Sequence, residues 1–314
     1  MELVHPMKKT HSIHSRRNFL KTGSAALVYG SVFWRGNSLL AASTLGLPLG
    51  LQLYSVRDLL PKDYDGTLQQ VASLGYREVE AAGFYNHTAG QVKQAMRNAG
   101  LRCVSAHYSY DDLHKQFDQI IAFNQGLGVG CIICSYPGYK DPSQHRNDQS
   151  QGPTFTLDDW RWNADQFNRI GEKVNAAGMK FGYHNHTMEF REQDGVVPYI
   201  ELLRLTDPSK VTMEMDCGWV IVGGGNPVEL LRRYPTRISM LHVKDFKKTG
   251  KPHSMSNPPP SAELGRGMID YRPIFEQAAK TGNIRHAFVE QEEFDIPPMQ
   301  ALKIDADYMR KLDA

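Results

Sequence analysis

Short apolar runs alternate with amphipathic segments along most of the chain, beginning near Leu49. Short apolar runs bounded by turn residues predict buried strands, whereas apolar positions that recur every three to four residues predict helices. The runs predicted as strands cover residues 50–55, 78–81, 103–106, 131–134, 180–183, 211–215, 238–243 and 287–289. Helices are predicted over residues 65–74, 88–98, 111–127, 157–177, 198–205, 227–234 and 298–312. Strands that alternate with helices are typical of a parallel sheet.

Eight such strands within roughly 265 residues match the size of a closed (β/α)8 barrel. An open, doubly wound sheet is the alternative, and it usually carries a glycine-rich phosphate loop after its first strand. The first predicted strand runs into LQLYSVRD, which is no glycine-rich phosphate loop. The sequence therefore predicts an α/β fold, a single-domain TIM barrel over residues 46–314.

The stretch 211–246 joins two predicted strands through a helix for which Asn226 is the expected cap and Pro227 the first residue. These two strands end on Asp216 and His242. The carboxyl ends of barrel strands share one rim, so the two side chains are expected to lie side by side. A carboxylate next to an imidazole favours a divalent ion such as Mn, Mg, Co or Zn. Each residue alone is also explained as a cap or a buried core histidine.

The same arrangement recurs at nearly every predicted strand end, because groups with acid–base or metal-binding capacity follow the apolar runs. These groups are Gln52, Tyr54, Glu80, His107, His184, His186, Glu189, Asp216, His242, Lys244, Glu290 and Glu292. So many polar groups on one rim of an apolar barrel favour a catalytic site over a set of unrelated structural residues.

Composition narrows the choice of partners. The 314 residues carry 36 Lys and Arg against 34 Asp and Glu, a net charge of +2, with no basic stripe. This balance argues against nucleic-acid binding. Cys131 and Cys134 form a CxxC motif inside the apolar run CIICSYP, which indicates a buried strand rather than a redox or zinc motif.

The first 45 residues differ from the rest of the chain. Arg16 and Arg17 precede Phe-Leu-Lys, a weakly apolar stretch at 22–33 and small residues around Ala42. This pattern resembles a twin-arginine (Tat) signal peptide, so residues 1–45 are predicted as signal peptide and linker. The resemblance implies the Tat translocase as a partner and a periplasmic or secreted protein. The apolar stretch is too short and polar for a permanent membrane span.

Four segments carry a more specific resemblance: FGYHNHTMEF, MEMDCGWV, RISMLHVKDF and AFVEQE. In this order they are similar to the xylose-isomerase-like sugar isomerase/epimerase superfamily, from about residue 46 to the C-terminus. The resemblance implies one divalent metal held by a carboxylate, an Asp, a His and a Glu on strands five to eight. Asp216, His242 and Glu290 match three of these ligands. The other ligand stays open, because strand register favours His184 and the charge of the family site favours Glu189.

The implied activity is isomerisation or epimerisation of a non-phosphorylated keto-sugar or aldose through an enediolate. Glu290 is expected to act as ligand and base, with Glu189 as its opposite proton carrier and His107 or His186 as further bases. Lys244 is expected either to bind a substrate oxygen or to form a rim salt bridge with Asp245 or Glu292. The residues expected to contact the carbohydrate are Gln52, Tyr54, Glu80, His186 and Trp219.

Two other functions remain open. A lyase that acts on 3-keto-glycosides begins with the same deprotonation and then expels a leaving group. A non-catalytic periplasmic sugar-binding protein uses the same barrel without chemistry. The sequence carries no prediction of the oligomeric state.

Overall fold

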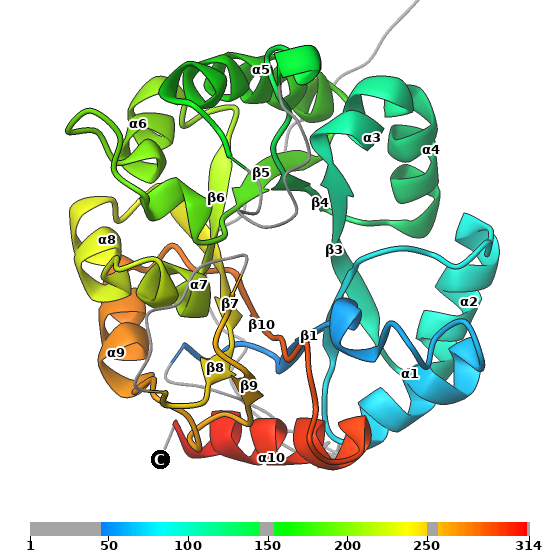
Figure 1. The fold of residues 1–314 in the computed structure, drawn as a ribbon. Coiled ribbons are helices and arrows are strands. Elements are labelled where there is room, and N and C mark those ends of the chain that lie inside the picture. Colours follow the sequence, from blue (N-terminus) through cyan, green and yellow to red (C-terminus); the bar gives the residue numbers. More distant parts are fainter. Residues whose placement is uncertain (1–44, 145–153, 250–256, 313–314) are drawn as a thin grey trace, which may run out of the picture. The chain divides into compact units, whose positions relative to one another are not determined.

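A closed barrel of parallel strands forms the centre of the structure (Figure 1), a computed structural model that describes residues 45–144, 154–249 and 257–312. Within these residues the strand order around the barrel is β1-β10-β7-β6-β5-β4-β3-β2. The barrel strands are β1 (Gly50–Gln52), β2 (Glu78–Ala81), β3 (Arg102–Ser109), β4 (Cys131–Tyr136), β5 (Lys180–His184), β6 (Thr212–Asp216), β7 (Ile238–Val243) and β10 (His286–Val289). Because β1 pairs with both β2 and β10, the predicted TIM barrel is confirmed and the open sheet is wrong.

Helices surround the ring of strands on its outer side (Figure 1). They are α1 (Tyr64–Ser73), α2 (Ala89–Ala99), α3 (Tyr110–Lys115), α4 (Phe117–Leu127), α5 (Leu157–Ala176), α6 (Pro198–Leu205), α7 (Cys217–Val222), α8 (Pro227–Arg233), α9 (Arg272–Thr281) and α10 (Pro298–Lys311), with short 3-10 turns η1 (Leu53–Val56), η2 (Pro142–Gln144) and η3 (Met188–Phe190). Local sequence explains several helix starts. Asn226 caps α8 with Pro227 at the first turn, as predicted, and Thr156 and Asp159 form a capping box on α5.

Several elements differ from the prediction. The first strand ends early because the Gln52 side chain accepts a hydrogen bond from the Tyr54 amide and begins η1. The helix predicted over 111–127 is two helices, α3 and α4, because Gln116 leaves the helical region. Neither glycine nor proline marks that break. The pattern also missed α9 and the two-stranded antiparallel sheet of β8 (Asp245–Phe246) and β9 (Ser261–Ala262).

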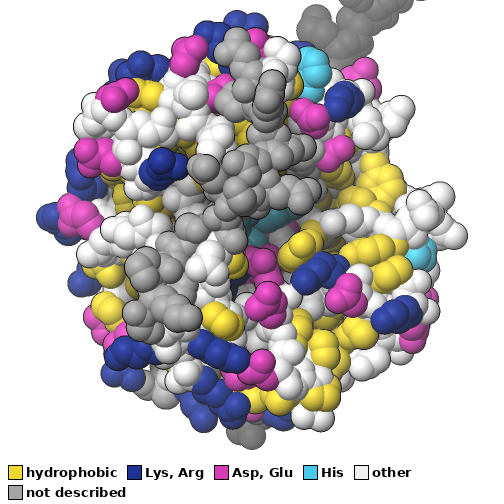
Figure 2. Space-filling model, in the orientation of Figure 1, with side chains coloured by type: hydrophobic (Ala, Val, Ile, Leu, Met, Phe, Trp, Pro, Cys, Tyr) yellow, Lys and Arg dark blue, Asp and Glu magenta, His cyan; other side chains and the backbone are white. Residues whose placement is uncertain are grey.

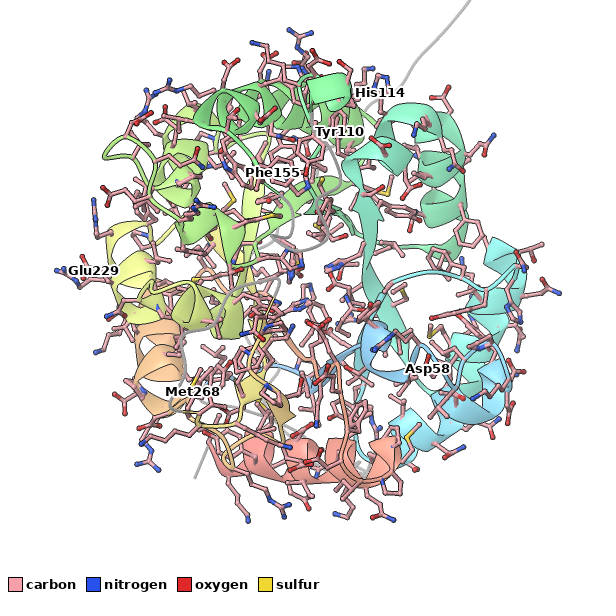
Figure 3. All side chains as sticks on the ribbon, in the orientation of Figure 1. Asp58, Tyr110, His114, Phe155, Glu229 and Met268 are labelled. Atoms are coloured by element: carbon pink, nitrogen blue, oxygen red, sulfur yellow. The ribbon has the colours of Figure 1, made fainter. Side chains whose placement is uncertain are left out.

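Side chains lie inside the ring of strands (Figure 3). They form an apolar layer and a polar layer. The apolar layer is a small buried cluster of Val104, Cys131, Ile133, Met240 and Phe288. Met240 and Phe288 come two residues before His242 and Glu290 on the same strands, so the apolar layer lies on the amino-terminal side of the polar groups. The polar layer therefore faces the carboxyl ends of the strands, where barrel enzymes bind their substrates.

The remaining predictions about the chain concern its cysteines, a membrane span and the signal peptide. The four cysteines lie within the described residues and are buried and free, and Cys131 and Cys134 belong to β4 as expected. Within the described ranges, no helix has both the length and the apolar character that crossing a membrane requires. The signal peptide predicted over residues 1–45 falls almost wholly on residues 1–44, which lie outside the described residues.

Candidate metal and catalytic site

Strand β6 delivers two carboxylates into the barrel. Glu214 and Asp216 share its inner face, while Met213 and Met215 alternate with them and pack into the main apolar core. Asp216 Oδ1 accepts a hydrogen bond of 2.7 Å from the Trp219 amide and thereby caps α7. Asp216 Oδ2 is buried and has no hydrogen-bond partner within the described residues. One oxygen of Asp216 thus serves the fold, and the other is left for a ligand.

Asp216, His242 and Glu290 come together at the carboxyl ends of β6, β7 and β10. One ligand atom from each lies within 4.8 Å of the others, and all three residues are buried. His242 Nδ1 lies 3.1 Å from Glu290 Oε2 and 4.0 Å from Asp216 Oδ2. Burial raises the pKa of Asp216 to about 6. Two carboxylates and an imidazole that converge in this way, with an Asp216 oxygen that accepts no hydrogen bond from the described residues, form a donor set that fits a divalent ion.

Lys244 lies against the same carboxylates. Its Nζ is 2.8 Å from Glu290 Oε2 and 3.4 Å from Asp216 Oδ2, and it also forms an ion pair with Glu292. The rim salt bridge is thus with Glu292, because the carboxylate of Asp245 accepts backbone N–H groups instead. Burial lowers the pKa of Lys244, but the three surrounding carboxylates hold it well above its usual value. Lys244 is therefore a cation at neutral pH, suited to bind an oxygen rather than to remove a proton.

Lys244 also affects Glu290. Burial opposes ionisation of Glu290, but the Lys244 ammonium and His242 hold the pKa of Glu290 well below its usual value. Glu290 is therefore ionised at neutral pH, which suits both predicted roles, ligand and base.

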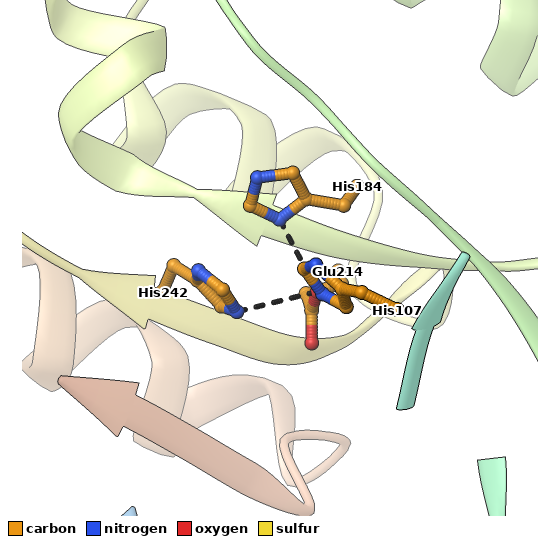
Figure 4. A group of neighbouring side chains, drawn as sticks. All are labelled: His107, His184, Glu214 and His242. Carbon is orange, nitrogen blue, oxygen red and sulfur yellow. Dashed lines mark hydrogen bonds and ion pairs between the residues drawn. The ribbon is translucent and has the colours of Figure 1, made fainter. Parts of the chain in front are cut away.

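A second polar group lies beneath the first and shares His242 with it (Figure 4). His107, His184, Glu214 and His242 each offer a ligand atom within 4.8 Å of the others. Glu214 Oε2 lies 2.7 Å from His107 Nε2, 3.2 Å from His184 Nδ1 and 3.3 Å from His242 Nε2. Burial lowers the pKa of His107, but Glu80 and Glu214 together raise it to about 9. His107 thus carries a proton at neutral pH in this structure, and its role as a base stays a prediction.

The two candidates for the open ligand position both have other partners. Glu189, in η3, is fully buried, and its carboxylate accepts hydrogen bonds from the Tyr183 hydroxyl and, at 3.0 Å, from the His186 amide. Burial raises the pKa of Glu189 to about 7. His184 bonds Glu214 instead. Neither residue joins the group of Asp216, His242 and Glu290, so the choice between Glu189 and His184 stays a prediction.

A cavity of about 460 Å³ opens above these groups. Its lining includes Tyr54, His186 and Trp219, as predicted for substrate contacts, together with His107 and Glu290. In Figure 2, histidine and acidic side chains are visible near the middle of this face, beside hydrophobic side chains. His186 Nδ1 has no hydrogen-bond partner within the described residues, and burial lowers the pKa of His186 to about 3. The cavity thus holds a neutral imidazole, whose protonated form is disfavoured by burial and by the nearby Lys244 cation.

Two of the expected substrate contacts are corrected by the structure. Gln52 and Glu80 have no exposed surface and do not line the cavity. They lie beneath it, where Gln52 Nε2 donates a hydrogen bond of 2.8 Å to Glu80 Oε1. Strand β2 has the predicted bounds, but the Glu80 side chain bonds Gln52, Ser105 and His242 inside the barrel, so in this structure it supports other side chains.

Comparison with known proteins agrees with this geometry. Residues 68–312 match the family model described as Xylose isomerase-like TIM barrel. The chain belongs to the xylose isomerase-like TIM barrel family. The resemblance seen in its strand-end segments is thereby confirmed at the level of the family.

Individual relatives of this xylose isomerase-like barrel carry different names. The inosose dehydratase of Lacticaseibacillus casei is 25% identical over 254 residues, which cover 73% of this chain and 82% of the relative. A sugar phosphate isomerase/epimerase from Parabacteroides distasonis ATCC 8503 has a crystal structure that is 30% identical with a TM-score of 0.66, covering 83% of this chain and 96% of that one. The IolI protein with a bound zinc atom, 12% identical with a TM-score of 0.63 over 84% of this chain and 97% of its own, shows a shared fold.

One residue of this xylose isomerase-like barrel was missed by sequence reasoning. Glu214 lies in the middle of the apolar run that ends on Asp216, where a charged residue was not considered as part of the site. The alternation of side chains along a strand could have identified Glu214, because it is two residues before Asp216 and must face the same side. The two carboxylates of β6 therefore belong to adjacent layers of one polar interior.

Proposed function

We propose that this protein is a divalent-metal-dependent isomerase or epimerase that removes a proton next to the carbonyl of a non-phosphorylated keto-sugar or aldose. The observation that carries the proposal is the buried group of Asp216, His242 and Glu290 at the base of a cavity, in which Asp216 Oδ2 accepts no hydrogen bond within the described part of the chain and lies 3.4 Å from the Lys244 ammonium. The family membership and the isomerase/epimerase neighbour in the solved structures support a sugar-processing enzyme.

The residues that would hold the ion are Asp216, His242 and Glu290, with Glu189 or His184 as the open fourth ligand. A divalent ion supplies Lewis acidity, which makes a C–H next to a carbonyl easier to deprotonate. Glu290, ionised beside Lys244, takes the proton from one face, and the Lys244 ammonium binds the oxygen on which negative charge develops. His186 lines the cavity as a neutral imidazole, suited to a hydrogen bond with the substrate rather than to proton uptake.

The cavity wall favours an uncharged sugar. Tyr54, Tyr108, Tyr136 and Trp219 line it, and aromatic faces pack well against the apolar face of a sugar ring. No lysine or arginine is among the described residues that line the cavity, and Lys244 beneath it is already paired with three carboxylates. Phosphate binding usually relies on such cationic side chains or on a helix N-terminus. We therefore assign a non-phosphorylated substrate.

Elimination is the second candidate reaction. It is favoured by the position of His107 in the cavity and by sequence similarity to inosose dehydratases. His107 lines the cavity, and its pKa of about 9 makes it a proton donor at neutral pH. A lyase needs such a donor, because the leaving group departs with the electron pair of its C–O bond and takes up a proton. The electron pair of the broken C–H bond forms the new C=C bond, and a base such as Glu290 takes up the proton from that bond. Similarity to inosose dehydratases supports loss of water or of an aglycone from a 3-keto-glycoside.

One experiment separates the two reactions. The protein would be purified, its metal quantified by mass spectrometry, and incubated in deuterated water with free ketoses, 3-keto-glycosides and an inosose. Deuterium at a carbon next to the carbonyl with an intact skeleton indicates an isomerase or epimerase. Release of the aglycone or of water, with an unsaturated ketone as product, indicates a lyase. Sugar binding without metal or exchange would contradict both and favour the sugar-binding protein.

We also propose export by the twin-arginine pathway to the periplasm or beyond, supported by the Arg16-Arg17 pattern in the first 45 residues. The test replaces both arginines with lysine in the full chain and measures cleavage and the cellular fraction. Retention of the uncleaved variant inside the cell is the expected result, and unchanged fractionation would contradict the proposal.

A further inference from the structure

We propose that Glu80 is a positioning residue that holds His242 with Nδ1 facing Asp216 and Glu290, and so sets the affinity of this site for a divalent ion. The inference rests on the proposed function, in which these three residues hold the ion. It gives a role to a carboxylate that lies beneath the cavity and touches no substrate.

The two ring nitrogens of His242 face different groups. Nδ1 points to the ligand group, 3.1 Å from Glu290 Oε2. Nε2 points down to Glu80 Oε1 at 2.7 Å. Both nitrogens lie within hydrogen-bond distance of a carboxylate, and the shorter contact, to Glu80, favours the hydrogen on Nε2, which leaves Nδ1 as the nitrogen available to a cation. A carboxylate partner also makes the ligating nitrogen more basic.

Glu80 is itself rigidly held. Gln52 Nε2 and His107 Nε2 each lie 2.8 Å from its Oε1, and the Ser105 hydroxyl donates to its Oε2 at 2.5 Å. Strand register explains the convergence, because Gln52 and Ser105 are the direct neighbours of Glu80 on β1 and β3. Four donors from three other strands therefore fix both the position and the plane of this carboxylate. A rigid acceptor is what a positioning role requires.

A competing arrangement uses the same histidine differently. His107, His184, Glu214 and His242 also lie close enough to share a cation, and that cation would bind His242 through Nε2. The contact distances favour the hydrogen-bonded arrangement, since His242 Nε2 is 2.7 Å from Glu80 but 3.3 Å from Glu214. An ion in the lower group would also have to displace the hydrogen bond between His107 and Glu214. The two arrangements differ in which nitrogen of His242 carries the metal.

The chain offers a matched control for Glu80 on the same strand. Glu78 is two residues earlier, equally inward and also buried, but it pairs with Arg102 and His286 at the opposite mouth of the barrel. Glu78→Gln and Glu80→Gln thus make the same chemical change at similar burial. The affinity of each full-length variant for Zn²⁺ and for Mn²⁺ alone would be measured by competition with a chelating indicator.

Glu80→Gln is expected to weaken metal binding by about 10- to 100-fold, the usual effect of removing the hydrogen-bond partner of a metal-bound histidine. Glu78→Gln is expected to leave the affinity unchanged. Nitrogen-15 spectra of histidine-labelled protein loaded with Zn²⁺ should show metal on Nδ1 of His242 and hydrogen on Nε2. Thermal unfolding of both variants reports any general loss of stability.

The outcomes are distinguishable. Equal affinity of Glu80→Gln and the wild type, or an equal loss in both variants, would overturn the inference while the proposed function stands. Metal on Nε2 would overturn it in favour of the lower group. A wild-type protein that binds neither ion would overturn the proposed function and the affinity claim together.

Discussion

The two mouths of the barrel handle buried charge in different ways. At the amino-terminal mouth, Glu78 is paired with Arg102 and His286, so its charge is balanced by close partners. At the carboxyl-terminal mouth, Asp216 keeps one oxygen without a hydrogen bond, although it is fully buried. Its charge is met by the Lys244 ammonium, 3.4 Å away, but a buried oxygen without a hydrogen bond costs stability unless a ligand supplies the missing contact. The contrast separates a charge that serves the fold from a charge that serves chemistry.

The largest expected effect is on turnover at the carboxyl-terminal mouth. Glu290→Gln removes the ionised carboxylate beside Lys244 but keeps the shape of the side chain. Loss of a positioned base lowers turnover by about 10²- to 10⁴-fold. Steady-state kinetics with the substrate that the deuterium experiment identifies would measure it, and thermal unfolding is the control for folding. A variant with wild-type turnover would remove Glu290 from the mechanism.

The next effect is on stability without metal. Lys244→Met leaves the buried carboxylates of Asp216 and Glu290 without their cation. Breaking a buried pair in this way costs about 3–5 kcal/mol of unfolding free energy. Added Mn²⁺ should recover more stability in the variant than in the wild type, because the ion no longer competes with the ammonium. Equal stabilisation of both proteins by Mn²⁺ would show that Lys244 and the ion do not share these ligands.

The two mouths should also respond to pH with opposite sign. The folded pKa of Asp216, about 6, is above its unfolded value, so its contribution is present at low pH and is lost as the pH rises toward 6. The pKa of Glu78 is lowered by His286 and Arg102 against the effect of burial, so its contribution is lost on acidification.

In metal-free protein, Asp216→Asn should therefore flatten the loss of stability between about pH 4 and pH 6. Glu78→Gln should flatten the loss at more acidic pH instead. Chemical denaturation across this pH range measures the unfolding free energy of both variants. The same pH profile in the two variants would contradict the predicted difference between the two mouths of the barrel.

The smallest expected effect belongs to an exposed partner at the amino-terminal mouth. The Arg102 side chain is 67% exposed, and solvent screens its ion pair with Glu78. Arg102→Met should change the unfolding free energy by less than about 1 kcal/mol and leave turnover unchanged. His286 continues to pair with Glu78 in this variant. A large loss of activity would show that the two ends of the barrel are coupled.

Some of this architecture follows from local sequence. The ring of strands and the meeting of Asp216, His242 and Glu290 were predictable because apolar runs end on these residues and their strands are neighbours in the sheet. The contact of Glu214 with His107 was not predictable, because the two residues are 107 positions apart in the chain and only the closed barrel brings them together. The position of Glu189 depends on η3 and on the Tyr183 hydroxyl, neither of which a period in the sequence encodes.

Because Asp216 caps α7 at Trp219, ion binding at the site can be followed by tryptophan fluorescence. The carboxylate of Asp216 that would bind an ion also accepts a hydrogen bond from the Trp219 amide. The centre of the Trp219 ring lies 4.7 Å from Lys244 Nζ. A cation that enters between Asp216 and Glu290 moves the ammonium and changes the electric field at this indole. The intrinsic fluorescence of the protein should therefore shift on metal titration, and a Trp219→Phe variant should lose that component of the signal.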